Sequence, residues 1–465
     1  MAFPSHIFKA YDIRGLADTE ISTEFAYRLG RAFVVFLRRR ALLKDGQAVV
    51  VGRDMRQTSP FFAKAIIQGI EAEGVDVVDV GLVSTPLFNF ACAHYSEHAG
   101  GIMVTASHNP AQYNGFKLTL GNGLPVGGQS GMGEMRELVE RGQFLDIPHS
   151  GAVKMFDVLP EYLKKIFSII SPQTIRPLKV VIDAGNGMAK TTFPKLIESL
   201  PVNVEYLFLE PDGTFPNHEA NPLKVETLAA LQRRVTAVGA DFGFALDGDA
   251  DRIGLVDERG RVVDASFVGA LVGLEVLRAH PQAHMLYDLR SSQIVPEVWR
   301  EAEGTVEMSM VGHANIKKRM KENGAVFGSE LSLHLYYHDM YDLESSDLSF
   351  LYILQALSRQ KKTLSRLVEP FQKYWHSGEI NFSAKGGHAF GGEFFDQTEI
   401  MKRVEEKYSE EAVKVFHLDG LWMQFDWGWF NVRVSNTEPM LRLNLEAPTE
   451  KAMKEKVAEV SALIK

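Results

Sequence analysis

The sequence predicts a multidomain α/β protein, and two observations support this fold class. The chain has 465 residues, whereas a single hydrophobic core rarely grows beyond about 250–300 residues. Three apolar runs end in glycine, aspartate or small polar residues and precede segments that can form helices; they span 48–56, 179–189 and 284–293. This order of strand, loop and helix is typical of α/β domains, which bind ligands at the carboxyl ends of their strands. We therefore expect three similar α/β domains in tandem.

The C-terminal region has a different pattern, which predicts a smaller α+β domain. Residues 421–426 and 429–435 resemble two strands that flank a turn at Trp427-Gly428. Leucine then occupies alternate positions in 440–446, and apolar residues recur at helical spacing from Thr449 onward. From about residue 372 we expect a small antiparallel sheet with helices on one face.

Turn-like segments suggest where the domains meet. One lies near 146–153 and another near 257–260. We place the four domains at 1–149, 150–256, 257–368 and 369–465.

The composition limits the function classes. Hydrophobic residues make up 45% and charged residues 23% of the chain, and the net charge of −9 provides no overall basic field for nucleic acid. Cys92 is the only cysteine, which excludes an intramolecular disulfide. The N-terminal residues lack the apolar core of a signal peptide, and no run of about 18 apolar residues could span a membrane. We expect a soluble cytoplasmic protein that binds neither nucleic acid nor membrane.

An acidic loop between two apolar runs predicts a metal site. Asp247, Asp249 and Asp251 occupy alternate positions, so an extended loop would point them to one side. Three converging carboxylates repel one another unless a cation lies among them, and all-oxygen ligation suits Mg²⁺. A solvated acidic turn is the alternative. An EF-hand is rejected because its sixth position requires glycine, whereas this chain has Arg252, which could instead bind a phosphate beside the metal.

Two further loops carry polar side chains with more than one interpretation. In 327–337, Glu330, Ser332 and His334 alternate with leucines. This pattern fits either a half-buried strand or a strand whose Glu330 accepts hydrogen bonds from two neighbouring sugar hydroxyls, with Ser332 beside it. In 433–439, Arg433 and the backbone N–H groups could hold a phosphate, or the loop could be a simple turn. The phosphate-binding candidates are Arg433, Ser435, Asn436 and Thr437.

A hydroxyl follows the apolar run that ends at Val104. Ser107 precedes His108 and Asn109, and Pro110 biases Asn109 away from helical geometry. A Ser–His hydrolase is one interpretation of this sequence. We disfavour it because adjacent residues on an extended loop point apart, and because the chain has no G-x-S-x-G turn around the serine.

Taken together, the motifs resemble the α-D-phosphohexomutase superfamily, most closely its bacterial phosphomannomutase/phosphoglucomutase branch. The matching segments are, in order, FKAYDIRG (8–15), TASHNP (105–110), DGDADR (247–252), GHANIKKRM (312–320), ELSLH (330–334) and RVSNTEP (433–439). The resemblance covers nearly the whole chain. It implies three mixed-sheet α/β domains and a smaller C-terminal domain around a central active-site cleft.

The resemblance also implies a reaction. Ser107 would be a phosphoserine that holds Mg²⁺ together with the three aspartates. It would pass its phosphoryl group to a hexose phosphate, giving a hexose 1,6-bisphosphate that turns around in the cleft and returns its other phosphate. The bisphosphate would also serve as activator. Substrates would be mannose phosphates and also glucose phosphates; the alternative is an amino sugar phosphate, either glucosamine or N-acetylglucosamine phosphate. We expect a monomer that acts on small sugar phosphates.

Further roles follow from the same resemblance. Arg14 and Arg252 would offset charge on the transferring phosphoryl group. Lys117 could exchange a proton with the reacting hydroxyl if neighbouring cations lower its pKa. His313 and His334 match histidines that line the cleft in the family. Tyr11 and Arg290 match cleft residues that would contact substrate.

The sequence departs from the family pattern at one position of the sugar loop. Leu333 stands where the family usually has glycine. The alternation predicts that Leu333 is buried, which would leave Glu330 and Ser332 unaffected. If Leu333 instead faced the cleft, it would narrow the room around the sugar.

Overall fold

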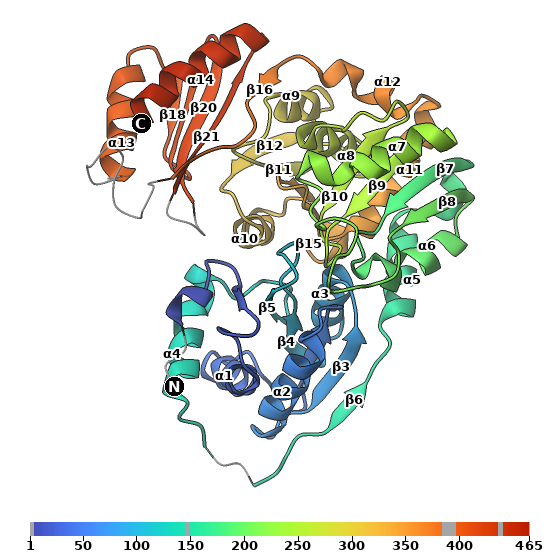
Figure 1. The fold of residues 1–465 in the computed structure, drawn as a ribbon, viewed down its shortest axis with the longest axis vertical. Helices are drawn as coiled ribbons and strands as arrows, with labels where there is room; N and C mark the ends of the chain where they lie inside the picture. The colour runs from blue at the N-terminus through green and yellow to red at the C-terminus, as the bar shows by residue number, and fades with distance from the viewer. Residues whose placement is uncertain (1–3, 146–147, 384–396, 436–439, 465) are drawn as a thin grey trace.

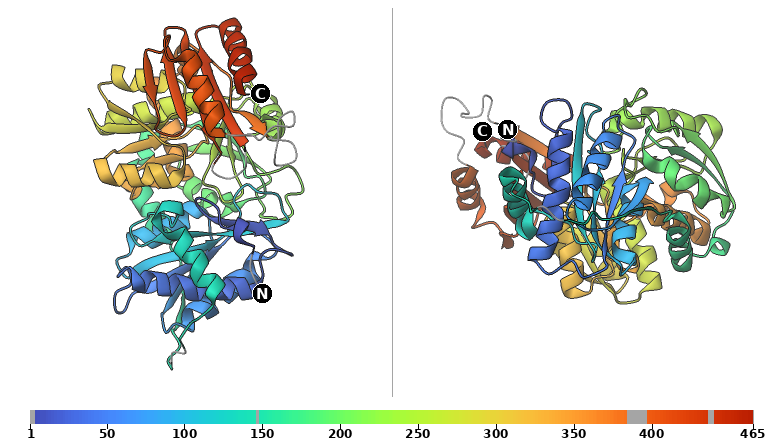
Figure 2. Two further views of the ribbon diagram at one scale, coloured as in Figure 1. Left: turned by 90° about the vertical axis from the view of Figure 1, so that its left-hand side faces the viewer. Right: turned by 90° about the horizontal axis from the view of Figure 1, so that it is seen from below.

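The computed structural model describes residues 4–145, 148–383, 397–435 and 440–464, and it contains four consecutive domains. The first domain, in blue, lies at one end of the molecule, and the C-terminal domain, in red, lies at the other (Figures 1 and 2). The predicted fold class, three mixed-sheet α/β domains and a smaller α+β domain, is confirmed. None of the helices in the described residues is long and apolar enough to cross a membrane.

The first domain contains a six-stranded sheet in the order β1-β5-β4-β2-β3-β6. Its strands are β1 (Ile13–Leu16), β2 (Ala48–Arg53), β3 (Val77–Leu82), β4 (His98–Val104), β5 (Tyr113–Leu120) and β6 (Val153–Met155). Its helices are α1 (Thr23–Arg39), α2 (Ser59–Glu71), α3 (Thr85–His94) and α4 (Gly133–Arg141). Because β2 and β4 are parallel neighbours, their carboxyl ends lie side by side at the edge where the loops after Arg53 and Val104 begin.

The second domain has four strands in the order β10-β9-β7-β8. They are β7 (Leu178–Asp183), β8 (Val202–Leu207), β9 (Phe242–Leu246) and β10 (Ile253–Asp257), accompanied by α5 (Leu159–Ile169), α6 (Phe193–Glu198) and α7 (Ala229–Val238). The strands β9 and β10 are antiparallel, so the acidic loop is the connection of a buried hairpin. This connection lies at the carboxyl end of β9.

The third domain has five strands in the order β12-β11-β13-β14-β15. They are β11 (His284–Asp288), β12 (Thr305–Ser309), β13 (Phe327–Ser329), β14 (Leu335–Tyr337) and β15 (Leu343–Glu344). The helices are α8 (Ala265–Ala279), α9 (Ile294–Glu301), α10 (His313–Asn323), α11 (Ser346–Gln360) and α12 (Leu364–Val368). The prediction of one continuous strand over 327–337 is wrong. The chain turns back at 330–334, and β13 and β14 pair antiparallel.

The C-terminal domain is an antiparallel sheet, as predicted. Its strands are β16 (Trp375–His376), β17 (Ile380–Ser383), β18 (Lys414–Phe416), β19 (Leu421–Phe425), β20 (Gly428–Val434) and β21 (Met440–Ala447), with helices α13 (Gln397–Tyr408) and α14 (Glu450–Ile464). Leu441, Leu443 and Leu445 share a buried face of β21 and pack against the helices. The hairpin turn falls one residue earlier than expected, because Phe425 pairs with Gly428.

The predicted domain boundaries stay predictions, but one structural fact bears on the first. Strand β6 lies after the proposed boundary at residue 149 and pairs with β3, so the first sheet continues to Met155. The main hydrophobic core runs through the first three domains without interruption. A smaller cluster of Leu289, Val311, Trp422 and Trp429 joins the third domain to the fourth. These shared cores fix the loops of different domains relative to one another.

Candidate active site

One cavity of about 690 Å³ is lined by side chains from all four domains. Most of the predicted site residues line it: Tyr11, Arg14, Ser107, Lys117, Asp251, Arg252, Arg290, His313, Glu330, Ser332, His334 and Arg433. Asp247 and Asp249 lie behind this surface and are fully buried. Ser435 is buried as well, whereas Asn436 and Thr437 lie outside the described residues. The structure therefore brings together residues that are separated by hundreds of positions in the sequence.

Ser107 lies at the carboxyl end of β4 and points its hydroxyl at the acidic loop. Its Oγ is 3.0 Å from Oδ2 of Asp247 and 3.1 Å from Nδ1 of His108, and the residue is 1% exposed. Ser107 adopts a left-handed φ of 51°. The expectation that Ser107 and His108 point apart is therefore wrong, because the left-handed turn replaces the extended geometry on which it rested.

The contact with His108 nevertheless does not make a hydrolase pair. Burial lowers the pKa of His108 well below its usual range, and the cations Arg252 and Arg14 lower it further. An imidazole in this environment takes up a proton poorly, so it is a weak general base for a neighbouring hydroxyl.

Sequence reasoning missed Arg56, which holds the serine loop in place. Its guanidinium donates to four main-chain carbonyls at 2.6–2.9 Å, those of Ser107, Asn109, Pro110 and Tyr113. Its Nε lies 3.2 Å from Asp54, and its Cζ lies 5.2 Å from the ring centre of Phe215 in the second domain. The signal was present in the sequence, since Arg56 ends the run 48–56 and so belongs to the segment after a strand where ligand-binding residues are expected.

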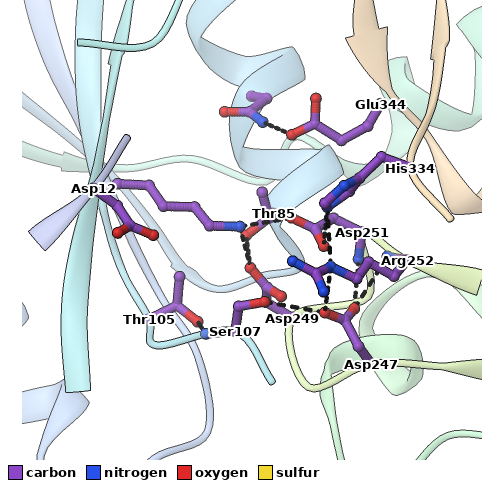
Figure 3. Close-up of polar contacts among 12 residues, drawn as sticks. Asp12, Thr85, Thr105, Ser107, Asp247, Asp249, Asp251, Arg252, His334 and Glu344 are labelled. Atoms are coloured by element: carbon purple, nitrogen blue, oxygen red, sulfur yellow. Dashed lines mark hydrogen bonds and ion pairs between the residues drawn. The ribbon is translucent and has the colours of Figure 1, made fainter. Parts of the chain in front are cut away.

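The three aspartates form a buried cluster, with one candidate ligand oxygen from each within 4.8 Å of the others (Figure 3). Burial raises the pKa of Asp247 well above its usual range, and the neighbouring carboxylates Asp251 and Asp249 raise it further. Oδ1 of Asp249 is buried without a hydrogen-bond partner. A carboxylate oxygen in this situation is costly unless a cation binds it. The cluster therefore fits a hard divalent cation such as Mg²⁺.

Close packing between two domains holds the acidic loop against the serine loop. A Cβ on Gly248 would lie 2.5 Å from the carbonyl oxygen of Ser107, so a side chain does not fit there. The Oγ1 of Thr85 donates to Asp249 at 2.6 Å. The domain interface thus sets the distance between the hydroxyl and the carboxylates.

Lys117 reaches the same carboxylates from β5. Its Nζ lies 2.6 Å from Asp249 and 2.6 Å from Asp251. Burial alone would lower the pKa of Lys117, but the two carboxylates outweigh it and raise the pKa above its usual value. The expected condition for proton exchange, a pKa lowered by cations, is therefore not met in this arrangement. The nearest partners of Lys117 are anions.

The two cleft histidines have opposite protonation preferences. Although burial disfavours a charged ring, Asp251 at 3.2 Å raises the pKa of His334 to about 9, and Glu330 supports the charged form. Burial lowers the pKa of His313 to about 3, and the ammonium groups of Lys317 and Lys117 act in the same direction. His334 is thus a cation near neutral pH, and His313 is neutral.

Arg14 and Tyr11 also line the cavity. Arg14 donates to Asp12 at 2.7 Å and to the side chain of Asn109 at 2.6 Å, so it is tied to the serine loop. Tyr11 donates its hydroxyl to the carbonyl of Val311 at 3.1 Å, which connects the first domain to the third. Arg252 lies 4.0 Å from Asp247 and 3.2 Å from His334.

Glu330 lies in the middle of the cleft at the start of the turn between β13 and β14. Its Oε1 accepts from the backbone N–H of Gly312 at 2.8 Å, and its Oε2 accepts from the hydroxyl of Tyr336 at 2.5 Å. Burial opposes the charged form, but His334 and Arg290 hold the pKa of Glu330 well below its usual range. Ser332 lies beside it, 3.1 Å from Nδ1 of His334. An ionised carboxylate keeps further lone pairs with which to accept from hydroxyls.

Leu333 is 6% exposed and packs into the main core, so it does not narrow the cavity. Its φ of +65° lies in the left-handed region, where a branched side chain is strained and glycine is not. This explains why glycine suits the position and why the turn differs from the predicted strand.

The far end of the cavity is rich in arginine. Arg433 on β20 is 2% exposed and donates to Glu379 at 3.2 Å. Arg442 on β21 lies 3.0 Å from Oε1 of Glu379, and Arg290 lies 3.5 Å from its Oε2. A cleft with a hydroxyl and carboxylates at one end and arginines at the other can hold a small molecule that carries phosphate.

Comparison with known proteins identifies the family. The chain matches the phosphoglucomutase/phosphomannomutase alpha/beta/alpha domains I, II and III at residues 5–144, 160–260 and 264–374, and the C-terminal domain of the same family at 385–463. It is 38% identical over 467 residues to a phosphomannomutase from Vibrio cholerae, with 98% of each chain covered.

Solved structures agree with this match. A phosphoglucomutase/phosphomannomutase family protein from Burkholderia thailandensis superimposes with a TM-score of 0.88 at 31% identity, covering 100% of this chain and 98% of that chain. An N-acetylphosphoglucosamine mutase from Aspergillus fumigatus, solved in complex with glucose 1,6-bisphosphate, shares the fold at 13% identity, with a TM-score of 0.60 over 100% of this chain and 96% of that chain. The chain belongs to the phosphoglucomutase/phosphomannomutase family and is a hexose phosphate mutase, an intramolecular phosphotransferase.

Proposed function

We propose that this enzyme interconverts the 6-phosphates and 1-phosphates of mannose and also of glucose, through a phosphoserine at Ser107 and a hexose 1,6-bisphosphate. The observation that carries the proposal is the position of Ser107. Its Oγ is 3.0 Å from the carboxylate cluster, in a cavity whose far wall carries three arginines. The matched relative from Vibrio cholerae is named a phosphomannomutase, which supports mannose phosphates as substrates.

The transfer needs two centres that handle phosphate at once. At the near end the Oγ–P bond of phosphoserine 107 breaks and an O–P bond to the sugar forms. The sugar hydroxyl gives up its proton to a basic group of the cleft, and the serine oxygen takes up a proton as it leaves. At the far end Arg433, with the loop containing Ser435, Asn436 and Thr437, would hold the phosphate that does not react. Glu330 lies 3.9 Å from Arg290 of the far end and 3.4 Å from His334, which contacts Asp251 of the near end, so Glu330 and the adjacent Ser332 would meet a sugar's hydroxyls.

The residues of the near end favour this chemistry. Arg14 and Arg252 would offset negative charge on the equatorial oxygens of the phosphoryl group. Asp247, Asp249 and Asp251, together with the phosphoserine, would hold Mg²⁺, which supplies charge neutralisation when bound. His334, with its raised pKa, adds a further positive charge beside Asp251.

A coupled assay tests the proposal. The 1-phosphates of mannose, glucose, glucosamine and N-acetylglucosamine are compared with Mg²⁺ and a trace of the matching bisphosphate. We expect turnover of the mannose and glucose compounds, and a phosphoryl group on Ser107 by intact mass. Ser107→Ala should abolish both, whereas Ser150→Ala, at an exposed position, should change neither. Full activity in Ser107→Ala would overturn the phosphoserine, and turnover restricted to the amino sugars would overturn the substrate assignment.

A further inference from the structure

The carboxylate of Glu379 lies among the arginines at the far end of the cavity. Glu379 lies in the connection between β16 and β17, and its oxygens contact three guanidiniums from two domains. The distances are 3.0 Å to Arg442, 3.2 Å to Arg433 and 3.5 Å to Arg290. Glu379 and all three arginines line the same cavity as Ser107. A carboxylate is thus bound where the proposed function places a phosphate.

The Glu379 carboxylate is shared by several buried or half-buried cations. Three guanidiniums face Glu379, and Arg433 and Arg290 are almost wholly buried. Arg290 also donates to Asp288 at 2.6 Å and lies 3.9 Å from Glu330. Closely spaced cations in a poorly solvated site attract any anion that fits, and a phosphate dianion carries more charge than a carboxylate. The site can therefore accept an anion stronger than the one that it holds.

Asp288 and Glu379, which both contact Arg290, differ in how firmly they are held. Asp288 is fully buried and also accepts from the backbone N–H groups of Arg290 and Leu331. The side chain of Glu379 is 23% exposed, and within the described residues its carboxylate contacts only the three arginines. It follows Gly378, an exposed glycine with a φ of +68°. Asp288 is therefore built into the site, whereas Glu379 can leave it by a change in one side chain.

We propose that Glu379 is a displaceable internal ligand of the distal phosphate site, which occupies the arginines between turnovers and yields them to the phosphate of a bound sugar phosphate. This inference rests on the proposed function in one respect, the identity of the ligand. The carboxylate keeps the arginines from repelling one another when no substrate is bound. It also competes with phosphate, and so it weakens binding at this end.

Such a competitor suits a reaction in which an intermediate must change ends. A bisphosphate that turns around has to release its distal phosphate from Arg433 and Arg442 without leaving the cleft. When the Glu379 carboxylate returns to the arginines, it stabilises the state in which the distal phosphate has been released. The guanidiniums then pair with the carboxylate in place of the phosphate. Glu379 would thus shorten the time for which the intermediate is held in one orientation.

Binding of inorganic phosphate tests the proposal without turnover, so its outcome is independent of the mutase assay. Titration calorimetry on the full chain should give roughly tenfold tighter phosphate binding for Glu379→Gln than for the unmodified protein. The gain should disappear in the double variant with Arg433→Ala, which places it at this site. Glu297→Gln is the matched control, because Glu297 ties the same connecting segment to the third domain through Tyr374 but does not line the cavity.

Affinity of Glu379→Gln that equals or falls below that of the unmodified protein would overturn the proposal and would make Glu379 an organiser of the arginines. If Glu379→Gln does not fold, a crystal structure of the unmodified protein with phosphate decides. Displacement predicts that the Glu379 carboxylate moves beyond about 4 Å from Arg433, the limit of an ion pair. A carboxylate that stays in place beside the bound phosphate contradicts the proposal.

Discussion

The two ends of the cleft hold their charged groups in different ways. At the near end, Arg56 fixes the serine loop by donating to main-chain carbonyls, and the acidic loop packs against the same backbone without room for a side chain at Gly248. At the far end, arginines are held by a side chain, Glu379, in a connection between two short strands. The near end cannot move without moving the backbone, whereas the far end can rearrange by rotation of side chains.

This difference matches two different demands on phosphate. Where a bond is made and broken, a displacement of about 1 Å can lower the rate on the order of a hundredfold, so the reacting oxygen has to be held still. Where a phosphate is only bound, and has to be released again, a rigid and fully matched site would bind too tightly. The contrast leads to four predictions.

The largest effect is expected at the acidic loop. Asp249→Ala removes one of three ligands and should lower kcat by about a thousandfold or more, because the remaining carboxylates hold Mg²⁺ too weakly to balance the transferring charge. The fold should survive, since the change also removes like-charge repulsion on Asp247. Coupled assays, Mg²⁺ titration calorimetry and thermal unfolding check this result, with the exposed Asp45→Ala as control. Normal Mg²⁺ affinity in Asp249→Ala would contradict the metal assignment.

Arg56→Met tests whether the near end depends on a fixed backbone. The variant removes the guanidinium that donates to four carbonyls and the charged partner of the buried Asp54, so we expect a loss of stability of about 3–5 kcal/mol. The serine should lose its position, and kcat should fall roughly a hundredfold while KM changes little.

Arg31→Met is the matched control for this prediction, because Arg31 is a largely buried arginine of the same domain that pairs with Glu73 away from the cavity. It should reduce stability without a comparable fall in kcat. If both variants lower kcat equally, Arg56 stabilises the domain but does not position the serine.

A smaller effect is expected at the far end. Arg433→Ala removes a charge-assisted contact that contributes about 1.5–3 kcal/mol, so kcat/KM should fall roughly ten- to a hundredfold. The factor should be similar in the forward and reverse directions, because one distal site would accept both phosphates in turn. The near end is untouched, so Ser107 should still carry its phosphoryl group by intact mass. A loss in only one direction would indicate two separate phosphate sites.

The sequence predicted the fold class and most of the residues at the cavity, because these depend on short-range patterns. Strand ends and alternating aspartates are visible within a few residues. The contacts of Arg56 and Glu379 were not visible in the sequence. The partners of Glu379 lie up to 89 positions away, and the ring beside Arg56 belongs to another domain. The partners of Lys117 were not visible either, because Asp249 and Asp251 come from the next domain.

The turn at 330–334 shows a second reason why a prediction failed. Its alternation of polar and apolar residues is that of a strand, and nothing in the local pattern indicates that Leu333 adopts a left-handed conformation. Glycine would have signalled a turn. Leu333 is strained in its backbone but well packed in the core, so the sequence pattern gives no sign of the turn.

Leu333→Gly, in the turn between the two ends, should have the smallest effect on activity. Two contributions oppose each other: the left-handed φ costs about 1–2 kcal/mol with leucine, and the buried side chain contributes about 2–5 kcal/mol. Packing should outweigh strain, so Leu333→Gly should lose about 1–3 kcal/mol of unfolding free energy. Leu333→Ala separates the contributions, because alanine loses the packing but keeps the strain. Glycine should thus be the more stable of the two variants by about 1 kcal/mol in urea unfolding.

Because Leu333 does not line the cavity, the ratio of rates on mannose and glucose phosphates should change less than about threefold, under 1 kcal/mol. A glycine variant less stable than the alanine variant would show that the backbone is not strained, and a large change in the ratio would show that the turn shapes sugar recognition at a distance.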